Sequence, residues 1–172
     1  MEGTLVQRSD KVAFMGVPDS TGSTYTYHRM QGFTEMTKSL NPKEYSRQYV
    51  DEIFEQTDVV GYTPNFAYAF DMYKGNPIHD DLAKLADTEA LGTAAVRPII
   101  IVDMTKPIDG SEGAFEAVKR DFSIIPDSEG NGFDAYGYSG NMRVKGSRIE
   151  GKAVDASTGD EDWLQVTFTV NA

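Results

Sequence analysis

The chain of 172 residues contains no cysteine, which excludes disulfide bonds and thiolate metal sites. His28 and His79 are its two histidines, so few side chains are available for imidazole chemistry. The apolar run 98–102 is far too short to cross a bilayer, and we expect no membrane contact. Residues 1–10 have neither a basic leader nor an apolar signal core, so we expect synthesis and residence in the cytoplasm.

Basic residues are also scarce. The chain has 16 Lys and Arg against 27 Asp and Glu, a formal net charge of -11. Tight nucleic-acid binding needs cations that displace counterions from phosphate, so this balance argues against it. It remains compatible with a surface past which nucleic acid slides without sticking. The length is ample for one domain and short for two, and we expect a single domain over residues 1–172.

Alternation of apolar and polar side chains predicts most of the secondary structure. In the stretch 63–73, Phe66, Tyr68, Phe70 and Met72 share one face, which is typical of a half-buried strand. The nearly continuous apolar run 96–102 predicts a strand that is buried on both faces. Further strands are predicted at 11–17, 24–30, 114–125, 136–144, 148–154 and 163–170. About seven to nine short strands indicate a mainly β fold, an antiparallel sandwich or barrel.

One helix is predicted, over residues 77–91. Asn76 is a suitable N-cap, Pro77 suits the first helical position, and Gly92 can end the helix. Ile78, Leu82 and Leu85 form an apolar stripe at helical spacing. We expect this stripe to flank the strands and cover one face of the sheet.

The sequence offers no convincing catalytic or metal-binding motif. The segment 138–140 lacks the glycines of a nucleophile elbow, and we expect both histidines on polar surfaces. Residues 127–132 begin like a calcium loop, but Tyr138 stands where a bidentate glutamate is needed. A glycine-rich turn is the better interpretation of this segment, with 126–132 as a loop. We therefore expect no enzymatic activity, no cofactor and no bound metal.

Residues 31–58 show no clear helix or strand pattern and are predicted to be a long loop. A connection of this length is uncommon in a compact domain and often carries function. A disordered acidic loop is one interpretation of it. The other is a protein–protein interface, because Tyr45, Tyr49, Ile53 and Phe54 alternate with charged residues, and interfaces are enriched in aromatic residues and arginine.

Three segments give the chain a resemblance to a known family: 41–52 with 54–62, 118–122, and 125–130. They resemble the major tail (tail tube) proteins of long-tailed bacteriophages and prophages of Gram-positive bacteria, and the resemblance runs from about residue 11 to residue 170. It implies a β-sandwich-like domain with one helix that assembles into hexameric rings around a channel. The rings would stack through the long loop, and DNA would pass through the lumen without specific binding.

The resemblance also implies sites and partners. The loop residues expected at the contact between rings are Glu44, Tyr45, Arg47, Tyr49, Asp51, Glu52 and Phe54. The expected partners are further copies of the chain and the tape-measure, tail-terminator and baseplate proteins. The expected location is the virion tail, after residence in the host cytoplasm.

A different class of protein also fits the strand pattern. The chain could be a monomeric carbohydrate-binding or adhesin-type β-sandwich, with Tyr25, Tyr27 and Trp163 as platforms for sugar rings. Particle size separates the two hypotheses. A lone module keeps its chain mass of 19.0 kDa, whereas a tube protein forms rings or tubes.

Overall fold

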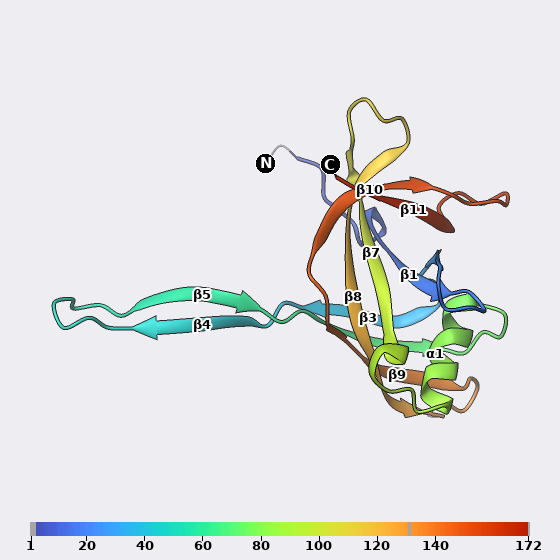
Figure 1. The fold of residues 1–172 in the computed structure, drawn as a ribbon, viewed down its shortest axis with the longest axis horizontal. Coiled ribbons are helices and arrows are strands. Elements are labelled where there is room, and N and C mark those ends of the chain that lie inside the picture. The colour runs from blue at the N-terminus through green and yellow to red at the C-terminus, as the bar shows by residue number, and fades with distance from the viewer. Residues whose placement is uncertain (1–2, 131, 172) are drawn as a thin grey trace.

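A computed structural model describes residues 3–130 and 132–171, and Figure 1 shows its β-rich body, one helix and a long hairpin. The elements along the chain are η1 (Arg8–Asp10), β1 (Lys11–Pro18), β2 (Tyr25–Arg29), β3 (Phe33–Ser39), β4 (Pro42–Arg47), β5 (Gln56–Tyr62), β6 (Asn65–Asp71), α1 (Pro77–Asp87), η2 (Gly92–Ala95), β7 (Val96–Pro107), β8 (Ala114–Glu129), β9 (Gly137–Val144), β10 (Ile149–Asp155) and β11 (Gln165–Val170). The prediction of a mainly β fold with one flanking helix is confirmed.

Six of the strands close into an antiparallel barrel. The order of the large sheet is β10-β11-β2-β1-β7-β8-β9-β6-β3, and β10 also pairs with β8. Strand β8 makes this closure possible because it is long enough to serve two partners: Ala114 to Lys119 pair with β10, and Phe122 to Glu129 pair with β9. Strands β9, β6 and β3 therefore extend from the barrel as a second layer, and β3 is the last strand of this order, next to β6.

The strands at the centre of the sheet supply two cores at once. Phe14, Ile100 and Val102 point into the barrel, whereas Met15 and Ile99 point to the opposite face. The continuous apolar run of β7 thus reflects burial on both faces, as the sequence predicts. Gly151 lets the barrel close tightly on β10, since a Cβ there would lie 2.3 Å from the Thr169 carbonyl oxygen.

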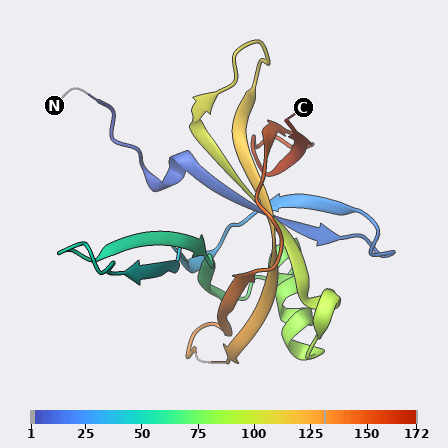
Figure 2. The same cartoon turned by 60° about the vertical axis from the view of Figure 1, so that its left-hand side comes forward.

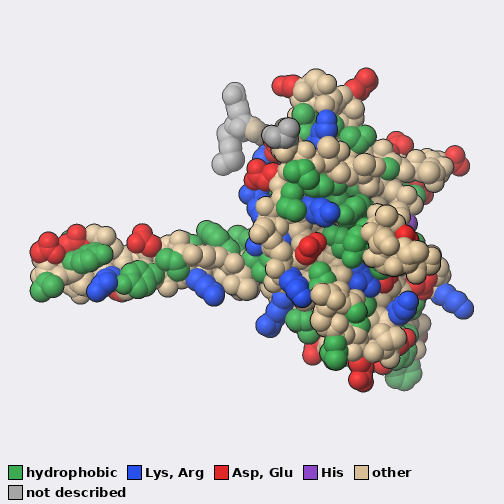
Figure 3. Space-filling model, in the orientation of Figure 1, with side chains coloured by type: hydrophobic (Ala, Val, Ile, Leu, Met, Phe, Trp, Pro, Cys, Tyr) green, Lys and Arg blue, Asp and Glu red, His purple; other side chains and the backbone are tan. Residues whose placement is uncertain are grey.

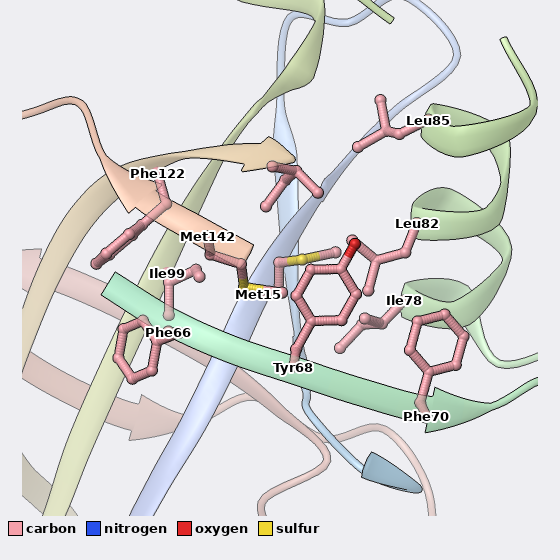
Figure 4. Close-up of a cluster of buried hydrophobic side chains, with 11 residues drawn as sticks. Met15, Phe66, Tyr68, Phe70, Ile78, Leu82, Leu85, Ile99, Phe122 and Met142 are labelled. Carbon is pink, nitrogen blue, oxygen red and sulfur yellow. The ribbon is translucent and has the colours of Figure 1, made fainter. Parts of the chain in front are cut away.

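The second core lies between the sheet and α1 (Figure 4). Tyr68 and Phe70 project from β6 towards Ile78 and Leu82 of the helix, and Phe66 lies further along the strand beside Phe122. The same cluster contains Met15, Leu85, Ile99, Phe122, Ile124 and Met142. The predicted apolar faces of 63–73 and of the helix therefore pack against each other.

Helix α1 begins as the sequence predicts but ends earlier. The Asn76 side chain accepts hydrogen bonds from the backbone N–H groups of Ile78 (3.0 Å) and His79 (3.4 Å). The helix ends at Asp87, because Thr88 caps it and Glu89 adopts a left-handed backbone with φ 48°. The segment that follows is irregular before η2, so the predicted boundary at residue 91 is wrong by about one turn.

His79 is fully buried, which corrects the prediction of a surface residue. Its ring lies 4.4 Å from Phe70 and 5.5 Å from Phe33, measured between ring centroids. The backbone N–H of Tyr73 donates to Nδ1 (3.2 Å), so Nε2 carries the proton and donates to the Gln31 carbonyl oxygen (2.9 Å). The residue is buried because it flanks the apolar stripe on the same side of the helix as Ile78. His28, the other histidine, is half-buried on β2.

The segment 31–58 is not one long loop, and that prediction is wrong. Strand β3 pairs with β6, and β4 pairs with β5 as a separate two-stranded sheet. A β-bulge between Phe33 and Glu35 and another after Lys43 interrupt the alternation. Every residue of β4 is exposed, so no apolar face marks it as a strand in the sequence.

The predicted loop at 126–132 is shorter than expected, because β8 continues to Glu129. The backbone N–H of Gly130 donates to the Gly137 carbonyl oxygen (2.9 Å), and Asn131 lies outside the described residues. No helix in the described parts of the chain is long and apolar enough to cross a membrane.

Candidate assembly arm

A hairpin made of β4, β5 and the turn between them, residues 42–62, projects from the body of the protein (Figures 1 and 2), and we call it the arm. Its strands pair in antiparallel register from Pro42↔Tyr62 to Arg47↔Gln56. Six residues of strand span about 20 Å at about 3.3 Å per residue, and the turn lies beyond them. The tip of the arm is therefore held away from its own subunit.

The base of the arm is a defined backbone junction. Asn41 has a left-handed backbone with φ 45°, a conformation that asparagine tolerates better than most residues. Its Nδ2 donates to the Thr63 carbonyl oxygen (3.1 Å), and the Thr63 N–H donates back to Leu40 (3.1 Å). Because β3 and β6 pair on the other side of this junction, the arm continues their hairpin and shares its anchorage in the body.

Apolar side chains at the tip of the arm are exposed to an unusual degree. Val50 has a relative exposure of 109%, Ile53 86% and Phe54 80%. Figure 3 shows hydrophobic and acidic side chains side by side along the outer part of the arm. An exposed apolar cluster rimmed by charge is typical of a surface that another protein covers.

The structure places all seven predicted contact residues on the arm, and all of them are exposed. Glu44, Tyr45 and Arg47 lie on β4, and Tyr49, Asp51, Glu52 and Phe54 lie in the turn. Arg47 brings two of the aromatic rings together: its Nη1 donates to the Tyr45 hydroxyl (3.1 Å), and its guanidinium lies 5.8 Å from the Tyr49 ring centroid. The expected contact of these seven residues with a neighbouring ring of subunits stays a prediction.

Two glutamines order the turn. Gln48 Nε2 donates to the carbonyl oxygens of Glu52 and Ile53, each at 3.3 Å. Gln56 Nε2 donates to the Glu52 carboxylate at 2.6 Å. Glu52 therefore has a structural role within the arm, in addition to the charge it presents at the surface.

Sequence reasoning missed several exposed apolar residues of the arm. Val50, Val59, Val60 and Tyr62 are all more than half exposed and belong to the same projecting element. The pair Val59-Val60 in an otherwise polar stretch was the available signal, because residues with high strand propensity seldom cluster in a flexible loop. The bulge after Lys43 shifts the register between Gly61 and Val59, so the side chains of β5 do not alternate regularly between its two faces. The sequence therefore lacks the period that would have predicted this strand.

The three proposed sugar platforms do not form one exposed surface. Tyr27 and Trp163 pack against the barrel core, and the Trp163 ring meets Phe115 edge to face at 5.4 Å between centroids. Tyr25 alone of the three is exposed. Within the described residues, no group of three or more His, Asp and Glu side chains is placed to hold a metal ion.

Comparison with known proteins reveals similarity of structure without similarity of sequence. A scan against protein-family models finds no match, and neither does a search of curated proteins. Among solved structures, the chain is similar to one described as "Tail of empty GTA particle computed with helical refinement, C6 symmetry", with a TM-score of 0.54 and 13% identity. The match covers 84% of this chain and 97% of the other.

A second similarity is weaker. It is to a chain of the "anti-feeding prophage (AFP) baseplate, 6-fold symmetrised", with a TM-score of 0.48 and 8% identity over 87% of this chain and 97% of that one. This value is too low to support an argument. At 13% identity, the GTA similarity shows that the two chains share a fold.

Proposed function

We propose that this chain is a structural tail tube protein that assembles into six-membered rings, which stack into a hollow tube. The observation that carries the proposal is the arm, a hairpin that projects from the body and ends in exposed apolar side chains. In a free monomer these apolar side chains stay exposed to water and add nothing to the stability of the fold. Ring stacking would bury these side chains and use the arm as the contact between rings.

The open edge of the sheet supports assembly within a ring. Within residues 3–130 and 132–171, strand β3 has a hydrogen-bonded neighbour strand on one side only, β6. Unpaired strand edges invite pairing with another chain, and closed rings satisfy such edges in a controlled way. The chain that shares this fold belongs to a tail with C6 symmetry, which supports six subunits per ring.

The acidic balance supports a conduit for DNA. A net charge of -11 disfavours tight binding to phosphates, so DNA would pass through the lumen without being held. The role proposed is structural and non-catalytic, in the virion tail, with assembly from subunits made in the host cytoplasm. Tape-measure, tail-terminator and baseplate proteins are the partners that such a tube requires.

The size of the purified particle tests the proposal. We expect light scattering at increasing protein concentration to detect species far above the 19.0 kDa chain mass. Electron micrographs of the same samples should contain rings and hollow tubes with six-fold symmetry. A strictly monomeric protein at all concentrations and ionic strengths would overturn the proposal.

A further inference from the structure

A groove of about 830 Å³ opens between η1, β1, the end of β2 and β3, and we call it the basic groove. Its apolar lining includes Met30, Phe33, Met36 and Phe66. These residues lie where the layer β3–β6 separates from β1, so the edge of the helix-side core is open to solvent there. Methionine side chains adapt readily to an incoming apolar surface, which suits such a groove to docking.

The groove is rimmed by positive charge in an otherwise acidic protein. Arg8, Lys11, Arg29 and Lys38 line it, and none of its lining residues in the described part of the chain is acidic. Lys11 has a carboxylate partner, Asp103, at 3.5 Å. Arg8, Arg29 and Lys38 have no salt bridge to any carboxylate of the described residues.

Lys38 also lies near cations outside the lining of the basic groove, Arg120 and Arg148. Partial burial lowers the pKa of Lys38, and repulsion from Arg148, Arg120 and Lys11 lowers it further. Repulsion between these like charges disfavours the charged form of Lys38 in the free subunit. An incoming group of negative charge would relieve the repulsion, so the groove is complementary to an acidic and partly apolar segment.

The tip of the arm has the complementary composition. The turn at the tip, residues 48–55, contains three carboxylates, Asp51, Glu52 and Glu55, and no Lys or Arg, and Asp58 follows on β5. Val50, Ile53 and Phe54 stand exposed among them. Apolar side chains of this size would fill the floor of the groove, and the carboxylates would face its rim.

We propose that the basic groove receives the acidic arm tip of a second copy of this chain, an inference that rests on the proposed function. The two surfaces lie at opposite ends of the arm. Lys38 is on β3, beside the base of the arm, and the tip lies beyond β4 and β5. The arm points away from the body, so the tip does not reach the groove of its own subunit (Figure 1). Because the two surfaces differ, the contact can propagate from copy to copy, as stacked rings require.

Charge reversal tests the pairing. The groove variant is Arg29→Glu with Lys38→Glu, the tip variant is Asp51→Lys with Glu55→Lys, and the swapped variant carries all four changes. We expect each double variant to raise the protein concentration needed for tubes by on the order of tenfold, because like charges then face each other. The swapped variant should regain tubes. Lys145→Glu, an exposed charge change outside the groove lining, is the matched control and should assemble normally.

The outcomes separate this inference from the proposed function. Wild-type protein that never assembles overturns both. Wild-type tubes that are unaffected by the groove variant, or a swapped variant that does not regain assembly, overturn the docking site alone. If melting curves show that the half-buried Arg29 does not tolerate glutamate, Arg29→Gln with Lys38→Gln removes the two charges with less disturbance, and the same assembly assay measures its effect.

Cross-linking gives an independent readout, helped by the absence of native cysteine. One copy carries Ile53→Cys on the tip, and a second, differently tagged copy carries Met36→Cys in the groove. We expect oxidation of the assembled mixture to join the two tags. Leu91→Cys, which is highly exposed but outside the groove, replaces Met36→Cys as the control and should give little product. Equal yields from the two mixtures would overturn the proposed site.

Discussion

A buried ion pair fixes α1 to the start of β7. Asp81 and Arg97 are both almost fully buried and meet in a bidentate contact, with Nε to Oδ2 at 2.6 Å and Nη2 to Oδ1 at 2.9 Å. The remaining Arg97 nitrogen, Nη1, donates to the carbonyl oxygens of Val96 (2.8 Å) and Ala94 (2.9 Å). Every charge in this group therefore has a partner, which offsets the cost of removing it from water.

Breaking this pair from one side should be strongly destabilising. Asp81→Asn leaves the Arg97 charge buried without its counter-ion, a change that costs about 3–5 kcal/mol in comparable cases. Thermal unfolding followed by circular dichroism should shift to a clearly lower temperature. Asp87→Asn, at the exposed end of the same helix, is the control and should change the melting temperature little. Equal melting temperatures for wild type and Asp81→Asn would show that the pair is not needed for stability.

His79 should make stability depend on pH. Burial lowers the pKa of His79 below its usual 6.5, although the bond to Gln31 and the charge of Asp80 act in the opposite direction. Below pH 6.5 the unfolded chain binds a proton that the folded chain resists, so stability falls as pH falls through this range. Urea unfolding at pH 7.5 and at about pH 5 measures the difference.

His28 contributes in the same direction, because partial burial lowers its pKa as well. His79→Gln should therefore reduce the pH dependence, and His28→Gln serves as the matched comparison. The decisive quantity is the change in stability between the two pH values for each variant, rather than its absolute stability. A His79→Gln protein that keeps the full wild-type dependence would contradict the assignment.

At the scale of secondary-structure elements, burial explains which predictions succeeded. The strands of the barrel and β6 bury one face or both, so their sequences alternate or run continuously apolar. Strands β4 and β5 bury neither face, and their sequences carry no such period. Composition could indicate that the arm is an interaction element. The hairpin shape of the arm could not be predicted from the sequence, because β4 and β5 pair with each other without packing on a hydrophobic core.

Helix α1 should act as structural support for the second core. Leu82 is 2% exposed and packs in the cluster that contains Phe70 and Met15. Leu82→Ala should reduce the free energy of unfolding by about 2–5 kcal/mol, through lost burial and the cavity left behind. Leu91→Ala removes the same atoms from a side chain that is 84% exposed, and should have almost no effect. Comparable losses in the two variants would argue against a supporting role for this face.

At the scale of the whole molecule, folding and assembly are assigned to different parts of the chain. Both cores lie in the body, and no residue of β4, β5 or the turn between them belongs to either cluster. The arm is joined to the body at Asn41 and Thr63, where the backbone hydrogen bonds are local. The stability of the body and the ability to assemble should therefore be separable by mutation.

Removing the arm tests this separation. The deletion replaces residues 43–61 by a two-residue turn, which removes β4 and β5 together except for Pro42 and Tyr62. Because the arm contributes to neither core, the melting temperature of the subunit should change little. Tubes should be absent from electron micrographs, even at concentrations where the intact protein forms them.

A second variant separates the length of the arm from its chemistry. Ile53→Ser with Phe54→Ser keeps both strands and the hydrogen bonds of Gln48, which are made to backbone carbonyl groups. Burial of each large apolar side chain stabilises a contact by about 1.5–3 kcal/mol. The double variant should therefore need a higher protein concentration to form tubes, although its arm is intact. Normal tubes from the deleted protein would remove the arm from the assembly contact. If the deleted protein fails to fold, the body needs the hairpin for its own stability, and the arm then belongs to the folding unit.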